Sequence, residues 1–202
     1  RPLPYDERTT ILPGVDIALR DAGHILGSAI VELWADGRKL VFSGDLGPKG
    51  TPILRDPAVV KQADLLLMES TYGDRNHRER PETIRELGAI FEHAWRDRGN
   101  VLIPAFAVGR TQELLYWFAR HWDAWKLARW RIFLDSPMAA KVIGVYARHH
   151  GLFDEDARRV WAQSPNPFRL PNLHVVETPQ QSMAINQVES GAIIIAGSGM
   201  AN

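Results

Sequence analysis

Apolar and polar residues are arranged over the first third of the chain in a pattern that predicts short strands joined by turns. Each apolar run is bounded by glycine or polar residues, as strands of a half-buried sheet are. The dipeptide Asp36-Gly37 is a strong signal for a two-residue hairpin turn. The predicted strands cover residues 15–20, 28–34, 39–43 and 64–68.

The spacing of apolar residues changes after residue 80. Pro81 suits the start of a helix, and apolar residues from Ile84 to Trp95 recur at helical spacing. Beyond them, buried-type strands alternate with amphipathic helices, which predicts a parallel sheet covered on both faces. The strands are expected at 101–105, 131–134, 173–176 and 192–196, and the helices at 111–122 and 138–149, with a helix and a loop over 153–168.

These patterns predict an α/β fold class with two parts. Residues 1–74 form the strand-rich part, and residues 75–202 form the part with the mostly parallel sheet and flanking helices. The boundary lies in the charged stretch near residue 75, where the hydrophobic period changes from that of strands to that of helices.

The composition restricts which metal ligands the chain can use, but it does not identify a binding partner. The 24 Lys and Arg residues balance the 24 Asp and Glu residues, so net charge gives no sign of a polyanion, although a local basic groove could still bind one. The chain has no cysteine, so any metal ion must bind to His, Asp or Glu. No apolar run is long enough to span a membrane, and a cytoplasmic location is the default expectation.

Two residues of the first part stand where metal ligands are often found. His24 lies in a glycine-flanked loop after a predicted strand, and Asp45 follows another strand inside Ser-Gly-Asp-Leu-Gly. A neutral imidazole and a carboxylate together suit Zn²⁺. The alternative is that His24 is a hydrogen-bonded structural residue and that Asp45 bonds the backbone of its own turn.

Glu69 is a third candidate, because it ends the apolar run at 64–68. A carboxylate in that position costs free energy unless it is paired or ligated. The alternative is a solvated carboxylate at the end of a strand.

Two glycine-containing loops of the second part could contact an anion. Residues 103–113 read as a strand, a loop and a helix start, where Thr111 could cap the helix and Arg110 could hold a phosphate. Ser198 and Gly199 lie in a Gly-Ser-Gly loop after a strand, where the backbone can approach a ligand closely. Ordinary turns between strands and helices are the alternative for both segments.

Read in order, these segments resemble the motifs of the β-CASP family of metallo-β-lactamase-fold nucleases. Residues 21–29 (DAGHILGSA), 43–47 (SGDLG) and 69–75 (ESTYGDR) resemble the third and fourth metal motifs and the acidic motif that opens the β-CASP domain. Residues 104–114 (PAFAVGRTQEL) and 196–201 (AGSGMA) resemble two further blocks. The resemblance covers essentially the whole chain. It is to the RNA-cleaving group that includes the eukaryotic cleavage and polyadenylation endonuclease and its prokaryotic relatives.

The resemblance implies a fold and a mechanism. The fold is part of a metallo-β-lactamase αββα sandwich over residues 1–74, followed by a nearly complete β-CASP domain. Two zinc ions would share a hydroxide that attacks the RNA phosphorus. His24 would bind one zinc, Asp45 would bridge both, and Glu69 would orient a histidine that protonates the leaving oxygen. Arg110, Ser198 and Gly199 would contact the substrate phosphates.

The sequence departs from the family pattern in one large respect. The metal motif His-x-His-x-Asp-His is not present in these 202 residues, and the remaining histidines do not have its spacing. In the family this motif precedes the segment seen here, and two more histidine motifs follow it. We therefore expect an internal piece of an enzyme that by itself binds zinc weakly or not at all and is inactive or nearly so.

Three other functions stay open at this stage. One is a non-catalytic RNA-binding or scaffolding subunit. Another is a DNA-directed nuclease, but DNA-type members tend to carry Asp where this chain has Glu69, which favours RNA as the partner. A small-molecule lactamase or thioesterase is disfavoured, because such an enzyme has no reason to carry an α/β insertion. Endonuclease or 5′–3′ exonuclease action, and the presence of a homodimer, are undecided.

Overall fold

A computed structural model describes residues 2–163 and 166–197 of the chain, which divides into two compact units. Residues 1–76 and 151–157 form the first unit, and residues 77–150 and 158–202 form the second. The sequence pattern had assigned 151–157 to the second part. That segment instead joins the first unit, since Phe153 forms a β-bridge with Leu54, and the Asp154 N–H donates to the Ile53 carbonyl at 2.8 Å.

The first unit is built on a five-stranded sheet in which the strands lie in chain order. Each of β1, β2 and β3 is antiparallel to the strand that follows it, and β5 runs parallel to β4. The strand at residues 8–12 was not predicted, because it lies at the edge, is almost entirely exposed and so lacks an apolar period. The strands are β1 (Arg8–Leu12), β2 (Val15–Asp21), β3 (Ala29–Ala35), β4 (Arg38–Phe42) and β5 (Leu65–Leu67).

The hairpin between β3 and β4 is confirmed at the predicted dipeptide. Asp36 and Gly37 have φ angles of 50° and 71°, and Ala35 pairs with Arg38. A two-residue turn with positive φ at both positions matches the right-handed twist of the flanking strands. The turn therefore sets the register in which β3 and β4 pair.

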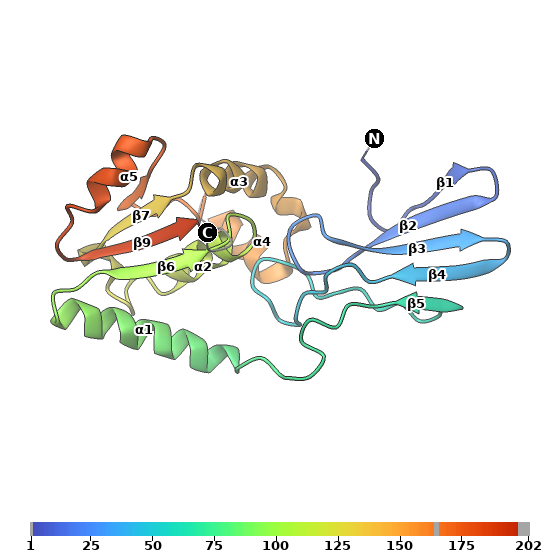
Figure 1. Ribbon diagram of the computed structural model, residues 1–202, viewed down its shortest axis with the longest axis horizontal. Coiled ribbons are helices and arrows are strands. Elements are labelled where there is room, and N and C mark those ends of the chain that lie inside the picture. Colours follow the sequence, from blue (N-terminus) through green and yellow to red (C-terminus); the bar gives the residue numbers. More distant parts are fainter. Residues whose placement is uncertain (1, 164–165, 198–202) are drawn as a thin grey trace. The chain divides into compact units, whose positions relative to one another are not determined.

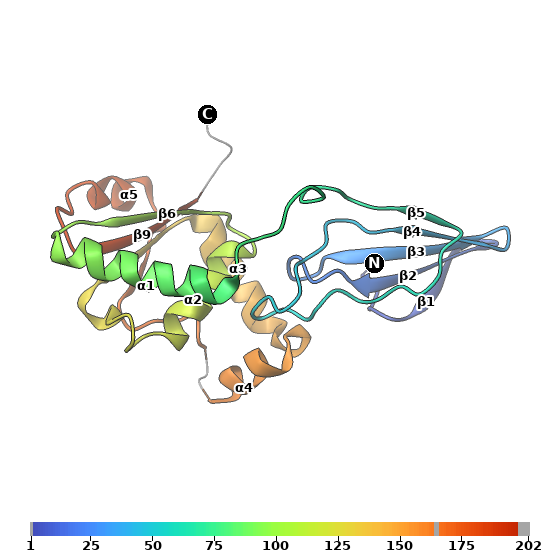
Figure 2. The same cartoon turned by 90° about the horizontal axis from the view of Figure 1, so that it is seen from below.

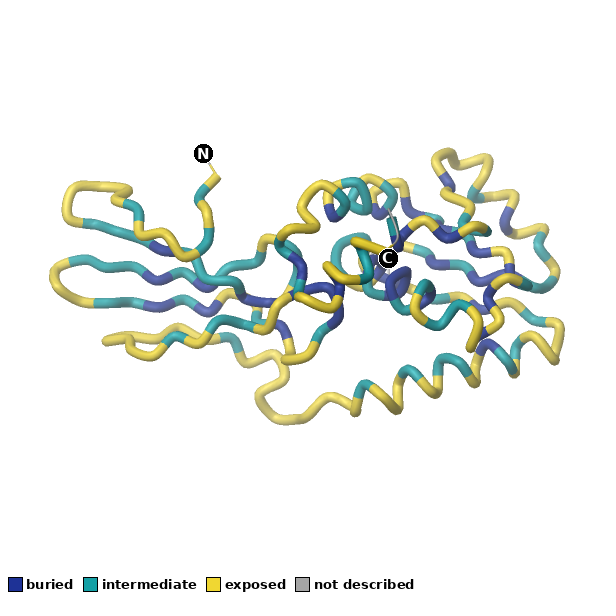
Figure 3. The backbone as a smooth tube through the Cα atoms, turned by 180° about the vertical axis from the view of Figure 1, so that it is seen from behind, coloured by how far each residue is buried: buried dark blue, intermediate teal, exposed yellow. Residues whose placement is uncertain are grey.

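The edge strand β5 is exposed although all of its residues are apolar. Its three leucines and the following Met68 are all about half exposed or more. Hydrophobic runs predict burial on both faces, but within the described residues β5 pairs with β4 alone. The segment from residue 70 to residue 79 is exposed throughout (Figure 3).

The second unit is built on a parallel four-stranded sheet in the order β6-β9-β7-β8. Helices α1 and α5 lie on opposite sides of it (Figures 1 and 2), which confirms the predicted α/β class with a flanked parallel sheet. Helix α5 was not predicted, because it is short and carries few apolar residues. The elements are α1 (Arg80–Arg96), β6 (Val101–Ala105), α2 (Arg110–Arg120), β7 (Arg131–Asp135), α3 (Pro137–Arg148), β8 (Leu173–Val175), α5 (Pro179–Ile185) and β9 (Ala192–Gly197). Helix α4 (Glu155–Gln163) begins in the first unit and ends in the second.

A cluster of aromatic rings packs α1 against α2 and the segment before β7. The ring of Phe91 is fully buried, and its centroid lies 5.6 Å from Phe118, 5.5 Å from Trp125 and 6.2 Å from Trp130. Edge-to-face contacts of this kind add to the free energy gained from burying the rings. This cluster anchors the long helix α1 on the second unit.

Within the described residues, none of the helices has both the length and the apolar character that crossing a bilayer would need.

Phe91 provides the first test of this packing. Replacing it by alanine removes the ring at the centre of the cluster and leaves a cavity, so we expect Phe91→Ala to lower the free energy of unfolding by about 3–5 kcal/mol. Arg85→Ala, at an exposed position of the same helix, should change it by no more than about 0.5 kcal/mol. Denaturant titrations followed by circular dichroism measure both, and equal effects would contradict the packing described here.

Candidate functional site

Three predicted site residues follow the ends of three strands that point the same way. Strands β2 and β4 are both antiparallel to β3, and β5 is parallel to β4, so the carboxyl ends of β2, β4 and β5 share one edge of the sheet. His24, Asp45 and Glu69 each lie within three residues of one of those ends. We call this region, formed by residues 22–28, 43–47 and 69–71, the three-loop edge.

The loop after β2 is held by its own polar side chains. The Asp21 carboxylate accepts a hydrogen bond from the Gly23 N–H at 2.9 Å. The Ser28 hydroxyl oxygen accepts two more, from the N–H groups of His24 at 3.1 Å and Ile25 at 3.3 Å. These bonds fix the backbone of His24, while its imidazole is exposed.

The loop after β4 lies directly against the loop after β2. The Gly47 N–H donates to the Ala22 carbonyl at 2.9 Å, and a β-carbon on Gly47 would lie 1.8 Å from the Gly23 carbonyl oxygen. No side chain fits in that space, so only glycine allows the approach. Leu46 packs beside it on a buried cluster that includes Ala22. Asp45 is therefore held close to the backbone of the His24 loop.

Glu69 joins the third loop to the second. Its carboxylate accepts hydrogen bonds from the Leu46 N–H and from the Thr71 hydroxyl, the latter at 2.6 Å. Its own N–H donates to the buried Ser43 hydroxyl oxygen at 3.0 Å. The Thr71 hydroxyl, the Leu46 N–H and, more weakly, the charge of His24 lower the pKa of the Glu69 carboxyl below its ordinary 4.5. Each oxygen of the Glu69 carboxylate thus accepts a hydrogen bond, so the carboxylate is paired and not merely solvated at the end of the strand.

His24 and Asp45 are free to bind a ligand, but they do not complete a metal site. Both residues are exposed, and in the described part of the chain neither side chain has a hydrogen-bond or ion-pair partner. No group of three or more His, Asp or Glu residues there is arranged to hold an ion. Since catalytic zinc normally takes three protein ligands, these two residues fit part of a zinc site only.

The strand-loop-helix segment of the second unit differs from its prediction. Gly109, not Thr111, is the residue before the first turn of α2. Thr111 is buried, and its hydroxyl donates to the Phe106 carbonyl at 2.8 Å, so the predicted capping role is wrong. Arg110 is exposed and pairs with Glu113 at 2.5 Å. Its predicted contact with phosphate stays a prediction.

Ser198 and Gly199, the other predicted substrate contacts, lie outside the described residues. Sequence reasoning had in turn assigned no role to Ser43 and Gly47. Both occur in the SGDLG segment, but a serine and a glycine after a strand are equally typical of an ordinary turn. Their functions as hydrogen-bond acceptor and close backbone contact depend on which strands are neighbours.

Comparison with known proteins relates the chain to nucleases. The Beta-Casp domain profile matches residues 111–202. Ribonuclease TTHA0252 of Thermus thermophilus is 44% identical over 200 residues, which cover 99% of this chain and 46% of the relative. Residues 111–202 belong to the β-CASP family. Endoribonuclease YSH1 of Yarrowia lipolytica is 33% identical over 77% of this chain and 19% of the relative, and transcription termination factor FttA of Methanosarcina mazei is 31% identical over 100% of this chain and 32% of the relative. The chain spans less than half the length of each of these relatives.

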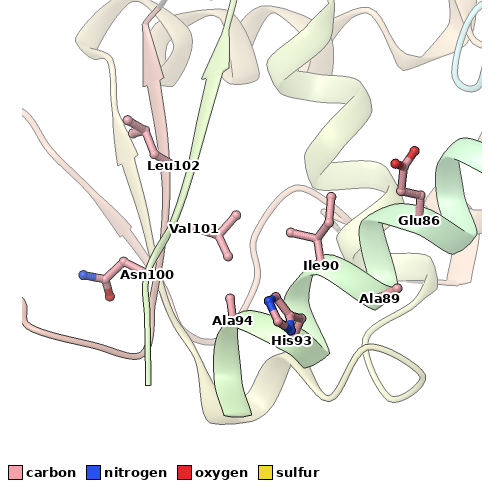
Figure 4. A pocket seen from close by; sticks show the side chains of 8 residues that line it. All are labelled: Glu86, Ala89, Ile90, His93, Ala94, Asn100, Val101 and Leu102. Carbon is pink, nitrogen blue, oxygen red and sulfur yellow. The ribbon is translucent and has the colours of Figure 1, made fainter. Parts of the chain in front are cut away.

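The second unit also has an apolar pocket of about 480 Å³, and no predicted site residue lines it. Ile90 and Val101 extend toward one another across the space between α1 and β6 (Figure 4). The ionisable side chains at its rim are engaged elsewhere, Glu86 with Arg78 and His93 with Asp97. The lining residues are Glu86, Ala89, Ile90, His93, Ala94, Asn100, Val101 and Leu102.

The Gly47→Ala substitution tests how closely the two loops approach one another. A methyl group at this position would collide with backbone, which cannot move aside as a flexible side chain can, so Gly47→Ala should lower the free energy of unfolding by at least about 3 kcal/mol. Gly151→Ala is the matched control in the same unit, because a β-carbon there meets open space. Thermal and denaturant unfolding measure the difference. A Gly47→Ala protein as stable as the control would show that the loops do not touch.

The Glu69 carboxylate gives a pH-dependent test. Its pKa is lower in the folded state than the ordinary 4.5, so its stabilisation is fully present above that value and is lost as the pH falls through the folded pKa. Glu69→Gln should therefore unfold more easily than the wild-type chain at neutral pH, and the difference should shrink as the pH falls below 4.5. Unfolding curves across this range measure it, and a difference independent of pH would exclude the charged carboxylate as its cause.

Proposed function

We propose that the protein carrying this chain is a zinc-dependent phosphodiesterase that cleaves RNA. The observation that supports this best is the three-loop edge, where an unpartnered imidazole and an unpartnered carboxylate are fixed on adjoining loops. Exposed His and Asp side chains held by rigid backbone are suited to bind a metal ion without reorganisation. The names of the relatives, a ribonuclease and an endoribonuclease, point to RNA as the substrate.

In this proposal each residue of the edge has a distinct part. His24 and Asp45 are two of the zinc ligands, and the ligands still needed come from outside the described residues. Glu69 is a positioning residue, because its carboxylate holds the Leu46 N–H beside Asp45 and so fixes the loop on which Asp45 lies. Arg110 is proposed as a phosphate contact, since its guanidinium is exposed despite its pairing with Glu113.

The proposal also covers the fold of the first unit and the location of the protein in the cell. The sheet of the first unit would be one layer of a metallo-β-lactamase sandwich, in which a further layer covers apolar residues such as those exposed on β5. A cytoplasmic location, the presence of a homodimer and the choice between endonuclease and exonuclease action stay predictions.

A second function, RNA binding without catalysis, is favoured by one observation. Within the described residues only two side chains are available to a metal at the three-loop edge. If the three loops serve only to stabilise the fold, the protein would bind RNA without cleaving it.

RNA hydrolysis by the protein in its full length decides between these functions. With zinc present we expect cleavage of a labelled single-stranded RNA, its loss on treatment with a chelator and its recovery on adding zinc back. His24→Ala and Asp45→Ala should each reduce the cleavage rate by at least about 100-fold, because second-shell changes alone already reach that size. Lys49→Ala, at an exposed position near Asp45, is the control and should leave it unchanged.

Other outcomes separate the alternatives. Tight RNA binding with no cleavage under any metal condition would support the non-catalytic subunit. Faster cleavage of a matched DNA strand would replace RNA by DNA as the substrate. Cleavage that persists in both single variants would remove the three-loop edge from the reaction.

A further inference from the structure

Phe106 is an exposed aromatic residue at the carboxyl edge of the parallel sheet. It follows β6 directly, and 64% of its surface is accessible. In the described part of the chain it stacks on no other ring. Ligands of open parallel sheets bind beyond the carboxyl ends of the strands, so the ring lies on the edge that a substrate would approach.

The loop that carries this ring is fixed by two buried polar side chains. The Thr111 hydroxyl donates to the Phe106 carbonyl at 2.8 Å, and the Thr111 N–H donates to the same oxygen at 3.3 Å. Gln112 accepts from the Gly109 N–H at 2.8 Å and donates to the Ala107 carbonyl at 3.0 Å. Thr111 and Gln112 are 1% and 0% exposed.

These bonds hold the loop in place, whereas surface loops are ordinarily mobile. The buried side chains of Thr111 and Gln112 hold the backbone of Phe106, Ala107 and Gly109 from inside the unit. The φ of 87° at Gly109 requires glycine. The exposed phenyl ring is therefore carried by a backbone that is held in place. A ring that served only the core would be turned inward, since burial of a phenylalanine side chain is strongly favourable.

The surroundings of Phe106 combine apolar surface with positive charge. Met138, in the first turn of α3 after β7, is 63% exposed on the same edge. Arg110 begins α2 directly after the loop, and among the described residues its guanidinium pairs through Nη1 with Glu113. An exposed aromatic ring and a guanidinium on the same loop and helix start suit a nucleotide, whose base stacks and whose phosphate is anionic.

We propose that Phe106 is a substrate-binding residue that stacks on a base of the single-stranded RNA substrate. This inference rests on the proposed ribonuclease function and names the group that holds the strand on the second unit. Stacking tolerates any base, because every base has a π-face, so Phe106 would hold the strand without reading its sequence. It therefore contributes to binding and alignment and leaves the chemical step unchanged.

Substitutions at Phe106 in the full-length protein test the stacking. Phe106→Leu keeps an apolar side chain but loses the aromatic face, and should raise KM for single-stranded RNA about 5- to 100-fold with little change in kcat. Phe106→Tyr keeps the face and should restore KM. Leu102→Ala is the matched control, because Leu102 is 66% exposed on the same strand and should have no effect.

A spectroscopic signal distinguishes stacking from a structural role. RNAs that each carry one 2-aminopurine, placed at successive positions, should include one whose fluorescence is quenched on binding to the wild-type protein and to Phe106→Tyr, but not to Phe106→Leu. An RNA abasic at that position should bind wild-type protein and Phe106→Leu equally. Equal KM values for the leucine variant and wild type, with RNA cleavage intact, would overturn the stacking and leave the ribonuclease function standing. Absence of both RNA binding and cleavage in the wild-type protein would instead remove the proposed function and the inference with it.

Discussion

The contact between the backbone of Gly47 and that of Ala22 and Gly23 controls the geometry of the three-loop edge in the first unit. The Gly47 N–H donates to the Ala22 carbonyl, and the absence of a side chain lets the two segments approach more closely than any other residue would permit. Asp45 lies two residues before this contact, and His24 lies one residue after Gly23. One glycine therefore holds together the two loops that carry His24 and Asp45.

The hydrogen bonds of Glu69 extend this constraint to a third strand. The carboxylate holds the Leu46 N–H, and the Glu69 N–H is held by the Ser43 hydroxyl, so the loops after β4 and β5 are joined at two points. A similar arrangement recurs in the second unit, where Thr111 and Gln112 hold the loop after β6 from inside. In both units buried or hydrogen-bonded polar groups support exposed side chains, which is how a site is organised before its ligand arrives.

Much of the fold follows from local patterns in the sequence. The Asp36-Gly37 hairpin requires a backbone conformation that few other dipeptides adopt, and the alternation of apolar strands with amphipathic helices leads to a parallel sheet. Elements without an apolar period were not predictable in this way. The edge strand β1 is exposed almost throughout, and helix α5 is short. The docking of residues 151–157 on the first unit depends on contacts between distant segments, such as Leu54 with Phe153.

In the candidate site, too, some residues are predictable from the local sequence, and others depend on contacts between distant segments. His24, Asp45 and Glu69 were identifiable from residue type, from their place after predicted strands and from the order of the motifs. The supporting roles of Gly47, Ser43 and Thr111 were not, because a turn glycine or a capping threonine has the same local sequence. Thr111 shows the error most clearly, since the pattern indicated a helix cap and the residue instead bonds the carbonyl of Phe106 from within the helix.

Anomalous diffraction at the zinc edge, from crystals of the full-length protein, reports whether His24 and Asp45 contribute to one metal centre. We expect anomalous peaks about 2.0–2.2 Å from an imidazole nitrogen of His24 and from a carboxylate oxygen of Asp45, on the same ion or on two neighbouring ions. Zinc peaks that touch neither side chain, in a protein that cleaves RNA, would contradict this expectation.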